Sequence, residues 1–228
     1  MQANVAPSAQ TCAITAYMTL AILVGMKAES ALAAALNWPT AIGGGTAEGA
    51  TKAANTLIAR GATALLSFGL AGGLDPSLPP GTLINPTHII DGPDRYATTP
   101  GLIPWAPRTG YTLAGSDIIL ATAAQKAAIF LITGAAAADM ESHAVARVAS
   151  RHGLPFAALR AITDPAATTL PHAALIALNP DGTINLAKLL RILAQNPAQL
   201  APLLTLARHA AAARRTLKTA IAYAPKNR

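Results

Sequence analysis

Two carboxylates and an imidazole fall within five residues of one another in an otherwise apolar part of this sequence. Asp139, Glu141 and His143 interrupt a stretch that is mostly alanine, in a chain of which 12% of the residues are charged. A structural explanation is a helix that Asp139 caps and whose other polar side chains face solvent. Glu141 and His143 are two positions apart and so lie on different faces of such a helix. The alternative is that one of the carboxylates does chemistry.

Two further carboxylates follow segments that have the composition of buried strands. Asp164 comes just after an expected strand at 157–162, and Glu29 comes soon after another at 19–24. Each also has a structural explanation, because Asp164 could begin a turn and Glu29 could be a first-turn acid favoured by the helix dipole. Three isolated carboxylates that each follow an apparent strand are harder to explain in this way. Ligands of open α/β sheets bind beyond the carboxyl ends of the strands, so these residues are candidate site residues.

Two glycine-rich segments accompany these carboxylates. The run 43–46 lacks the spacing of a dinucleotide-binding fingerprint, and no acidic residue follows about 20 positions later. Its backbone N–H groups, at the start of a helix, could instead hold an anion or a polarised water. The run 69–73 ends an expected strand that begins at 64, and glycine there lets the backbone approach a ligand closely.

Buried strands alternate with alanine-rich helices along the chain. We expect strands at 19–24, 64–68, 82–85, 88–90 and 157–162, and helices at 28–36, 47–60 and 139–152. The proline-rich segment 91–108 has the composition of a long loop. This alternation predicts an α/β fold, a three-layer αβα single domain with a mixed, largely parallel central sheet.

Length and composition narrow the class of protein. A chain of 228 residues that is 52% hydrophobic can bury a sizeable core. Its single cysteine gives neither a disulfide framework nor a metal-ligand cluster, which favours a reducing, cytoplasmic compartment. The apolar run 14–26 is too short to span a membrane. We therefore expect a flexible N-terminal tip at 1–13 and one domain at 14–228.

The net charge of +7 is concentrated near the C-terminus. One interpretation is a docked helix whose basic edge is solvated, with an apolar face of leucines; another is attraction to an anionic membrane surface. Nucleic acid is disfavoured because no aromatic residues interleave with these charges. The basic residues are Arg208, Arg214, Arg215, Lys218, Lys226 and Arg228, and the leucines are Leu200, Leu203, Leu204, Leu206 and Leu217.

Several segments resemble one enzyme superfamily in their order along the chain. Gly25 to Glu29, Ser67 to Leu74, Asp139 to Ser142 and Arg160 to Asp164 resemble segments of the purine and uridine nucleoside phosphorylases and of the related methylthioadenosine/S-adenosylhomocysteine nucleosidases. The whole chain is most similar to the hopanoid-associated phosphorylases, which also share segments like 115–117, 139–147 and 178–182. The resemblance implies a nucleoside phosphorylase-like fold and cleavage of a ribosyl N-glycosidic bond, with release of adenine from adenosylhopane.

The resemblance also implies a role for individual residues. Asp164 would be the general acid that protonates the purine, and Glu29 would orient or deprotonate an attacking water. Glu141 would accept hydrogen bonds from the ribose hydroxyls, with Met140 packed against the sugar. The other implied residues are Ile118, Ile119 and Leu120 against the base, Gly69, Ala71 and Gly72 in the strand-end loop, and Gly25, Lys27, Gly45 and Thr46 around a phosphate or water.

The nucleophile stays open between phosphate and water. Phosphate usually requires an arginine cradle, yet 25–29 offers only Lys27 and 69–74 has no basic residue. Arg160 stands too early in its strand to be assigned to this role. Glu29 therefore favours water, whereas the hopanoid-associated family favours inorganic phosphate as a co-substrate; no other cofactor and no metal is expected.

Three functions remain in competition. The first is cleavage of adenosylhopane, whose lipid 5′ group would need an apolar channel such as one formed by the loop 102–105, and which implies peripheral contact with the inner membrane surface. The second is a methylthioadenosine-type nucleosidase with a small 5′ group, and the third is a catalytically silent nucleoside-binding protein. The resemblance also implies a homodimer.

Overall fold

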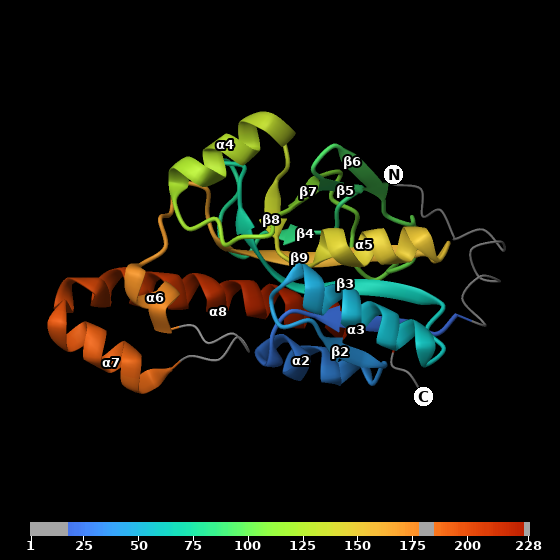
Figure 1. Cartoon of the computed structure of the whole chain (residues 1–228), viewed down its shortest axis with the longest axis horizontal. Helices are drawn as coiled ribbons and strands as arrows, with labels where there is room; N and C mark the ends of the chain where they lie inside the picture. The colour runs from blue at the N-terminus through green and yellow to red at the C-terminus, as the bar shows by residue number, and fades with distance from the viewer. Residues whose placement is uncertain (1–17, 178–184, 226–228) are drawn as a thin grey trace, which may run out of the picture.

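The structure is a computed structural model that describes residues 18–177 and 185–225. The tip expected at 1–13, the segment 178–182, Lys226 and Arg228 lie outside the described residues. Figure 1 shows a sheet with helices on both faces and a helical extension built from α6, α7 and the first part of α8.

One mixed sheet forms the centre of the described part of the chain. The strand order is β2-β1-β3-β8-β7-β5-β6, and β9 pairs with β3 and with β4. Five of the eight strand pairs are parallel, which confirms the expected largely parallel sheet. The strands are β1 (Leu20–Val24), β2 (Thr40–Ile42), β3 (Ala64–Gly73), β4 (Leu83–Ile84), β5 (His88–Asp91), β6 (Asp94–Ala97), β7 (Thr112–Gly115), β8 (Ala137–Asp139) and β9 (Phe156–Asp164).

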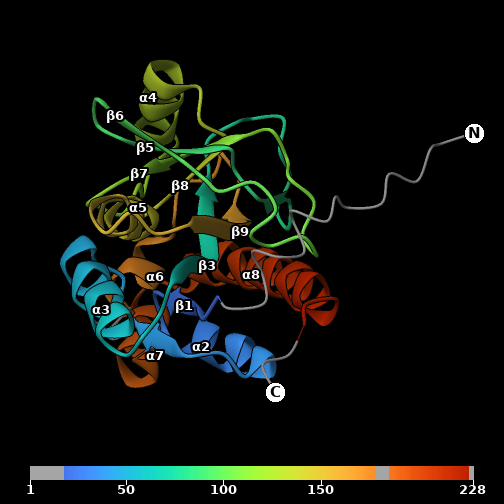
Figure 2. The ribbon, with the colours of Figure 1, turned by 90° about the vertical axis from the view of Figure 1, so that its right-hand side faces the viewer.

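The helices cover the sheet on both sides and complete three layers. α3 and α5 pack against each other on one face, and α8 packs along β9 on the other (Figure 2). The helices are α2 (Lys27–Ala33), α3 (Ala47–Ala59), α4 (Ala123–Thr133), α5 (Ser142–Arg151), α6 (His172–Ala177), α7 (Leu186–Gln195) and α8 (Leu200–Ala222), with short 3₁₀ turns η1 (Ala34–Leu36) and η2 (Pro197–Gln199).

Alternating side chains of β1 and β3 supply two of the three buried cores in the described residues. Leu23 and Leu65 point into the core shared with α3 and α5, whereas Ile22 and Leu66 point into the core shared with α8. Successive residues of a strand point to opposite faces, so a continuous apolar run is what a strand covered on both sides requires. The apolar runs at 20–24 and 64–68 meet this requirement.

Short strands and one helix depart from the expectations. The proposed loop 91–108 contains β6, and the sequence pattern did not indicate β2, β7 or α4, because strands of three or four residues carry little periodicity. The helix expected at 139–152 begins only at Ser142, since Asp139 ends β8. The expected leucine face of α8 is also wrong in part: Leu217 is buried, but Leu200 and Leu204 are each 50% exposed.

Candidate active site

A fully buried arginine stands at the centre of a cluster of carboxylates at one end of the sheet. Nε of Arg160, in β9, lies 2.5 Å from Oδ2 of Asp139, and its Nη2 lies 3.3 Å from Oε2 of Glu141. Nη2 also donates to Ser67 Oγ at 2.6 Å. Burial would lower the pKa of Arg160, but attraction to Asp139, Glu141 and Glu29 raises it above its ordinary value. Arg160 was not assigned from the sequence, because its position on β9 becomes informative only when β3 and β8 lie beside it.

Gly69 makes room for this cluster. The register of the parallel pair β3–β9 sets Gly69 opposite Arg160. A Cβ on Gly69 would collide with the carboxylate of Glu29 and lie 2.7 Å from Nη1 of Arg160. Its φ of 154° is also one that residues with a side chain rarely adopt. A larger residue at this position would therefore displace both charged groups.

Glu29, in the first turn of α2, accepts hydrogen bonds from three backbone N–H groups. Its Oε2 accepts from the N–H groups of Gly25 and Met26, both at 2.9 Å, and its Oε1 accepts from Leu70 at 2.8 Å. The side chain thus joins the turn after β1 to the glycine-rich end of β3. Burial raises the pKa of Glu29, although Arg160 and these hydrogen bonds oppose the rise.

Glu141 lies between the end of β8 and the first turn of α5 and is 6% exposed. Its carboxylate packs against Gly25, where a Cβ would lie 2.9 Å from Cδ of Glu141. Burial raises its pKa to about 8, against the attraction of Arg160 and with added repulsion from Asp139 and Glu29. This raised pKa brings the titration of Glu141 close to neutral pH, and in its protonated form the group can donate one hydrogen bond as well as accept others.

Asp139 and His143 do not face solvent, so the explanation of a helix whose polar side chains face solvent is wrong for both residues. Asp139 does cap α5, because its Oδ1 accepts from the N–H groups of Glu141 and Ser142 at 3.1 and 2.8 Å. It is nevertheless 6% exposed and pairs with Arg160. The ring of His143, 2% exposed, lies against Gly115 with Nε2 3.2 Å from Oδ1 of Asp117.

Asp164 is the last residue of β9 and pairs with a lysine that the sequence did not single out. Nζ of Lys126, in α4, lies 2.5 Å from Oδ2 of Asp164 and also donates to the carbonyl oxygens of Pro165 and Thr168. Lys126 is fully buried. The hydroxyl of Thr163 donates to the other carboxylate oxygen at 2.5 Å. A lysine within a mostly apolar helix could have indicated a buried charge with a partner. The sequence could not identify that partner, because Asp164 is 38 positions away.

The cluster around Arg160 and the Lys126–Asp164 pair are both attached to β9. Arg160 and Asp164 are four residues apart on β9, roughly 13 Å at 3.3 Å per residue. Gly72 borders Asp164, with a Cβ position 3.4 Å from Oδ2. The loop expected at 69–73 is not a loop, because β3 continues to Gly73.

The remaining candidate residues are spread around this end of the sheet. Gly45 lies beside Glu141, whereas Thr46 caps α3 by accepting from the N–H of Gly49 at 3.1 Å. Lys27 is exposed, Met140 and Leu120 are half-buried, and Ala71 is buried in the core. Ile118 and Ile119 are 60% and 40% exposed in the loop that leads to α4.

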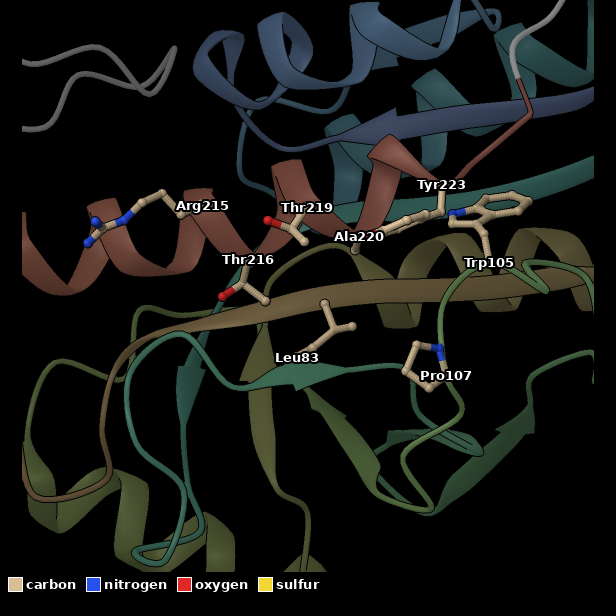
Figure 3. A pocket seen from close by; sticks show the side chains of 8 residues that line it. All are labelled: Leu83, Trp105, Pro107, Arg215, Thr216, Thr219, Ala220 and Tyr223. Atoms are coloured by element: carbon tan, nitrogen blue, oxygen red, sulfur yellow. The ribbon is translucent and has the colours of Figure 1, made fainter. Parts of the chain in front are cut away.

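A separate pocket of about 470 Å³ lies between α8 and the strand β4 (Figure 3). Its lining contains no residue of the cluster around Arg160 and neither member of the Lys126–Asp164 pair; the residues are Leu83, Trp105, Pro107, Arg215, Thr216, Thr219, Ala220 and Tyr223. The loop 102–105 belongs to this side of the molecule, where Ile103 is buried in the α8 core and Trp105 packs edge-on against Trp38. The expected channel along this loop is therefore not part of the charged site.

Within the described residues, no group of three or more His, Cys, Asp or Glu side chains is arranged to hold a metal ion. None of the described helices combines the length and apolarity needed to cross a membrane.

Known proteins share both a sequence segment and the fold with this chain. Residues 102–195 match the sequence pattern of the phosphorylase superfamily. No curated protein matches the sequence. Among solved structures, a methylthioadenosine/S-adenosylhomocysteine nucleosidase from Helicobacter pylori superposes with a TM-score of 0.64 at 18% identity, over 90% of this chain and 98% of that one.

Two further structures agree with this match. The futalosine hydrolase of Helicobacter pylori gives a TM-score of 0.64 at 18% identity, over 90% of this chain and 97% of its own. A methylthioadenosine/S-adenosylhomocysteine nucleosidase from Campylobacter jejuni gives 0.61 at 20% identity, over 89% and 99%. The superfamily pattern thus covers residues 102–195, and the three structures show that the chain shares the fold of these nucleosidases and of the hydrolase.

Proposed function

We propose that this protein is an enzyme that cleaves the ribosyl N-glycosidic bond of a purine nucleoside. The observation that carries the proposal is that β9 holds Asp164 at its end and, four residues earlier, Arg160 within the cluster that includes Glu141 and Glu29. The structures with the same fold include two nucleosidases and a futalosine hydrolase, which supports this reaction class.

In this mechanism Asp164 protonates the purine as the bond to the ribose breaks. Breaking the bond leaves positive charge on the sugar, and the acidic cluster around Arg160 stabilises that charge through those of its carboxyl groups that are ionised. Glu141 binds the ribose hydroxyls, with Met140 beside it. The exposed Ile118 and Ile119, with Leu120, line the approach to the base.

Water is the nucleophile that the site favours. Arg160 is already surrounded by Asp139, Glu141 and Glu29, so its charge is matched before any ligand binds. A phosphate dianion brought to this cluster would meet three acidic groups for one arginine, whereas a water molecule could be oriented by Glu29 and Arg160. Phosphorolysis with inorganic phosphate as co-substrate is the competing reaction, through Lys27 and the turn 43–46.

Adenosylhopane is the substrate we propose, on the resemblance to the hopanoid-associated phosphorylases. Such a lipid-linked nucleoside would be met by a cytoplasmic protein at the inner face of a membrane, so peripheral attachment is part of the proposal. The competing substrate is methylthioadenosine or S-adenosylhomocysteine, which the nucleosidases of similar fold are named for. A catalytically silent nucleoside-binding protein is the third function in competition, and a homodimer is the proposed assembly.

Adenine release distinguishes these functions in one set of assays. Purified protein is incubated with adenosylhopane in detergent micelles or with methylthioadenosine, each with and without phosphate, and adenine and the sugar product are quantified. The proposal predicts that the sugar product carries a hydroxyl group, not a phosphate, at the ribose carbon that held adenine. It also predicts faster adenine release from adenosylhopane than from methylthioadenosine, and no acceleration by phosphate. A ribosyl phosphate product would establish phosphorolysis, preference for methylthioadenosine would establish the smaller substrate, and binding without release would establish the silent protein. Size-exclusion chromatography with light scattering measures the assembly.

A further inference from the structure

The outward face of α8 carries an exposed stripe of leucines and basic residues. Ala213, Leu217 and Ile221 are buried against the sheet, which fixes the orientation of the helix. At 100° per residue, positions 200, 204, 208, 211, 215 and 218 fall together on the opposite side. All six are exposed, and the stripe, which is about 27 Å long at 1.5 Å per residue, consists of Leu200, Leu204, Arg208, Ala211, Arg215 and Lys218.

No acidic residue offsets these charges along the chain. From residue 182 to the C-terminus the sequence contains no aspartate or glutamate. The preceding helix α7 adds exposed Lys188 and Arg191, together with Leu186 and Leu190, which are 64% and 58% exposed. Large apolar side chains are therefore left in solvent within a purely cationic part of the protein.

We propose that this stripe docks the protein onto anionic lipid bilayers. Arginine and lysine attract anionic headgroups, and leucines on the same helix face can insert at the boundary of the acyl chains. The exposed leucines favour a bilayer over nucleic acid, because contact with a phosphate backbone requires cations but gains nothing from aliphatic side chains. The proposal concerns the surface alone and stands whether or not adenosylhopane is the substrate.

Binding to vesicles tests the proposal with a matched pair of variants. The test variant is R208Q/R215Q/K218Q, and the control is R60Q/R95Q/R151Q, which removes three exposed positive charges from the other parts of the protein. Both variants have a net charge of +4, from +7 minus 3, so non-specific attraction falls equally. Co-sedimentation is measured with vesicles of phosphatidylcholine alone and of phosphatidylcholine mixed with phosphatidylglycerol, and circular dichroism verifies that both variants are folded.

We expect the wild type to bind the anionic vesicles and not the neutral ones. The test variant should lose about two orders of magnitude in partition coefficient, at about one kcal/mol per basic residue, and the control far less. Replacing Leu200 and Leu204 by Ser should weaken binding to the anionic vesicles by a similar factor at low and at moderate salt, because salt screens the charges but not the insertion of leucines. Equal losses in the two charge variants, no binding by the wild type, or preferential binding of duplex DNA through the same three residues would overturn the proposal.

Discussion

Lys126 and Asp164 form a buried ion pair that joins α4 to the end of β9, with Nζ 2.5 Å from Oδ2. The same ammonium donates to two carbonyl oxygens just beyond the strand, so it fixes the turn that follows Asp164 as well as the carboxylate itself. In the proposed mechanism Asp164 gives a proton to the purine, and its carboxylate is bound to an ammonium group that itself carries exchangeable protons. We infer that Lys126 positions Asp164 for this step.

Replacing Lys126 by Met should lower kcat by about 10²-fold, the lower end of what a positioned acid contributes, with little change in KM. It should also destabilise the fold by about 3–5 kcal/mol, because a buried carboxylate loses its partner. Steady-state kinetics well below the melting temperature measure the first effect, and thermal melting measures the second. The double variant K126M/D164N should recover most of the lost stability, since neither charge remains. Additive losses in stability would show that the pair is not coupled.

Replacing Asp164 by Asn should reduce adenine release by about 10²–10⁴-fold while leaving nucleoside binding nearly unchanged. The amide keeps the shape of the side chain but has no acidic proton to transfer to the base. Single-turnover adenine release and calorimetric binding of a non-hydrolysable nucleoside analogue separate the two effects. Exposed Asp94, which lies on β6 at another part of the sheet, gives the control D94N, with expected wild-type turnover. Wild-type turnover in D164N would rule out Asp164 as the acid.

Gly69→Ala should destabilise the protein by about 1–3 kcal/mol and disrupt the cluster, because the new methyl group overlaps the Glu29 carboxylate and lies close to Arg160. Gly61→Ala is the matched control, since Gly61 has a φ of 92° but no atom within 4 Å of its Cβ position. The control therefore carries backbone strain without the contact. Melting temperatures and adenine release are compared in the two variants; equal stability and full activity in both would show that Gly69 has no steric role.

The sequence was sufficient to predict the layers of the fold and to indicate that carboxylates follow the carboxyl ends of several strands. Long apolar runs such as 64–68 identify buried strands, and carboxyl ends of strands meet at one edge, which brings Glu29 and Asp164 to the same side. It was not sufficient for Arg160 and Lys126. Their roles depend on cross-strand register and on packing between α4 and β9, contacts that no local pattern encodes. The outward orientation of Leu200 and Leu204 likewise depends on which face of α8 meets the sheet.

Glu141 should make the stability of the protein depend on pH in a predictable direction. In the unfolded chain its pKa is near the ordinary 4.5, whereas in the folded protein burial raises it to about 8. Between these values the folded state binds more protons than the unfolded state, so this contribution to stability is full below pH 4.5 and is lost as the pH rises to 8. Glu141→Gln does not titrate and should be free of this loss.

The melting temperature of the wild type should therefore fall relative to that of E141Q from pH 5 to pH 8 and run parallel to it above pH 9. Thermal melts at constant ionic strength measure the difference between the two proteins at each pH. E48Q is the control: Glu48 is exposed and paired with Lys52, which lowers its pKa, so its difference from the wild type should stay constant over this window. A wild-type minus E141Q difference that is equally flat would mean that Glu141 is ionised in the folded protein, and the ribose would then meet a carboxylate, not a carboxylic acid.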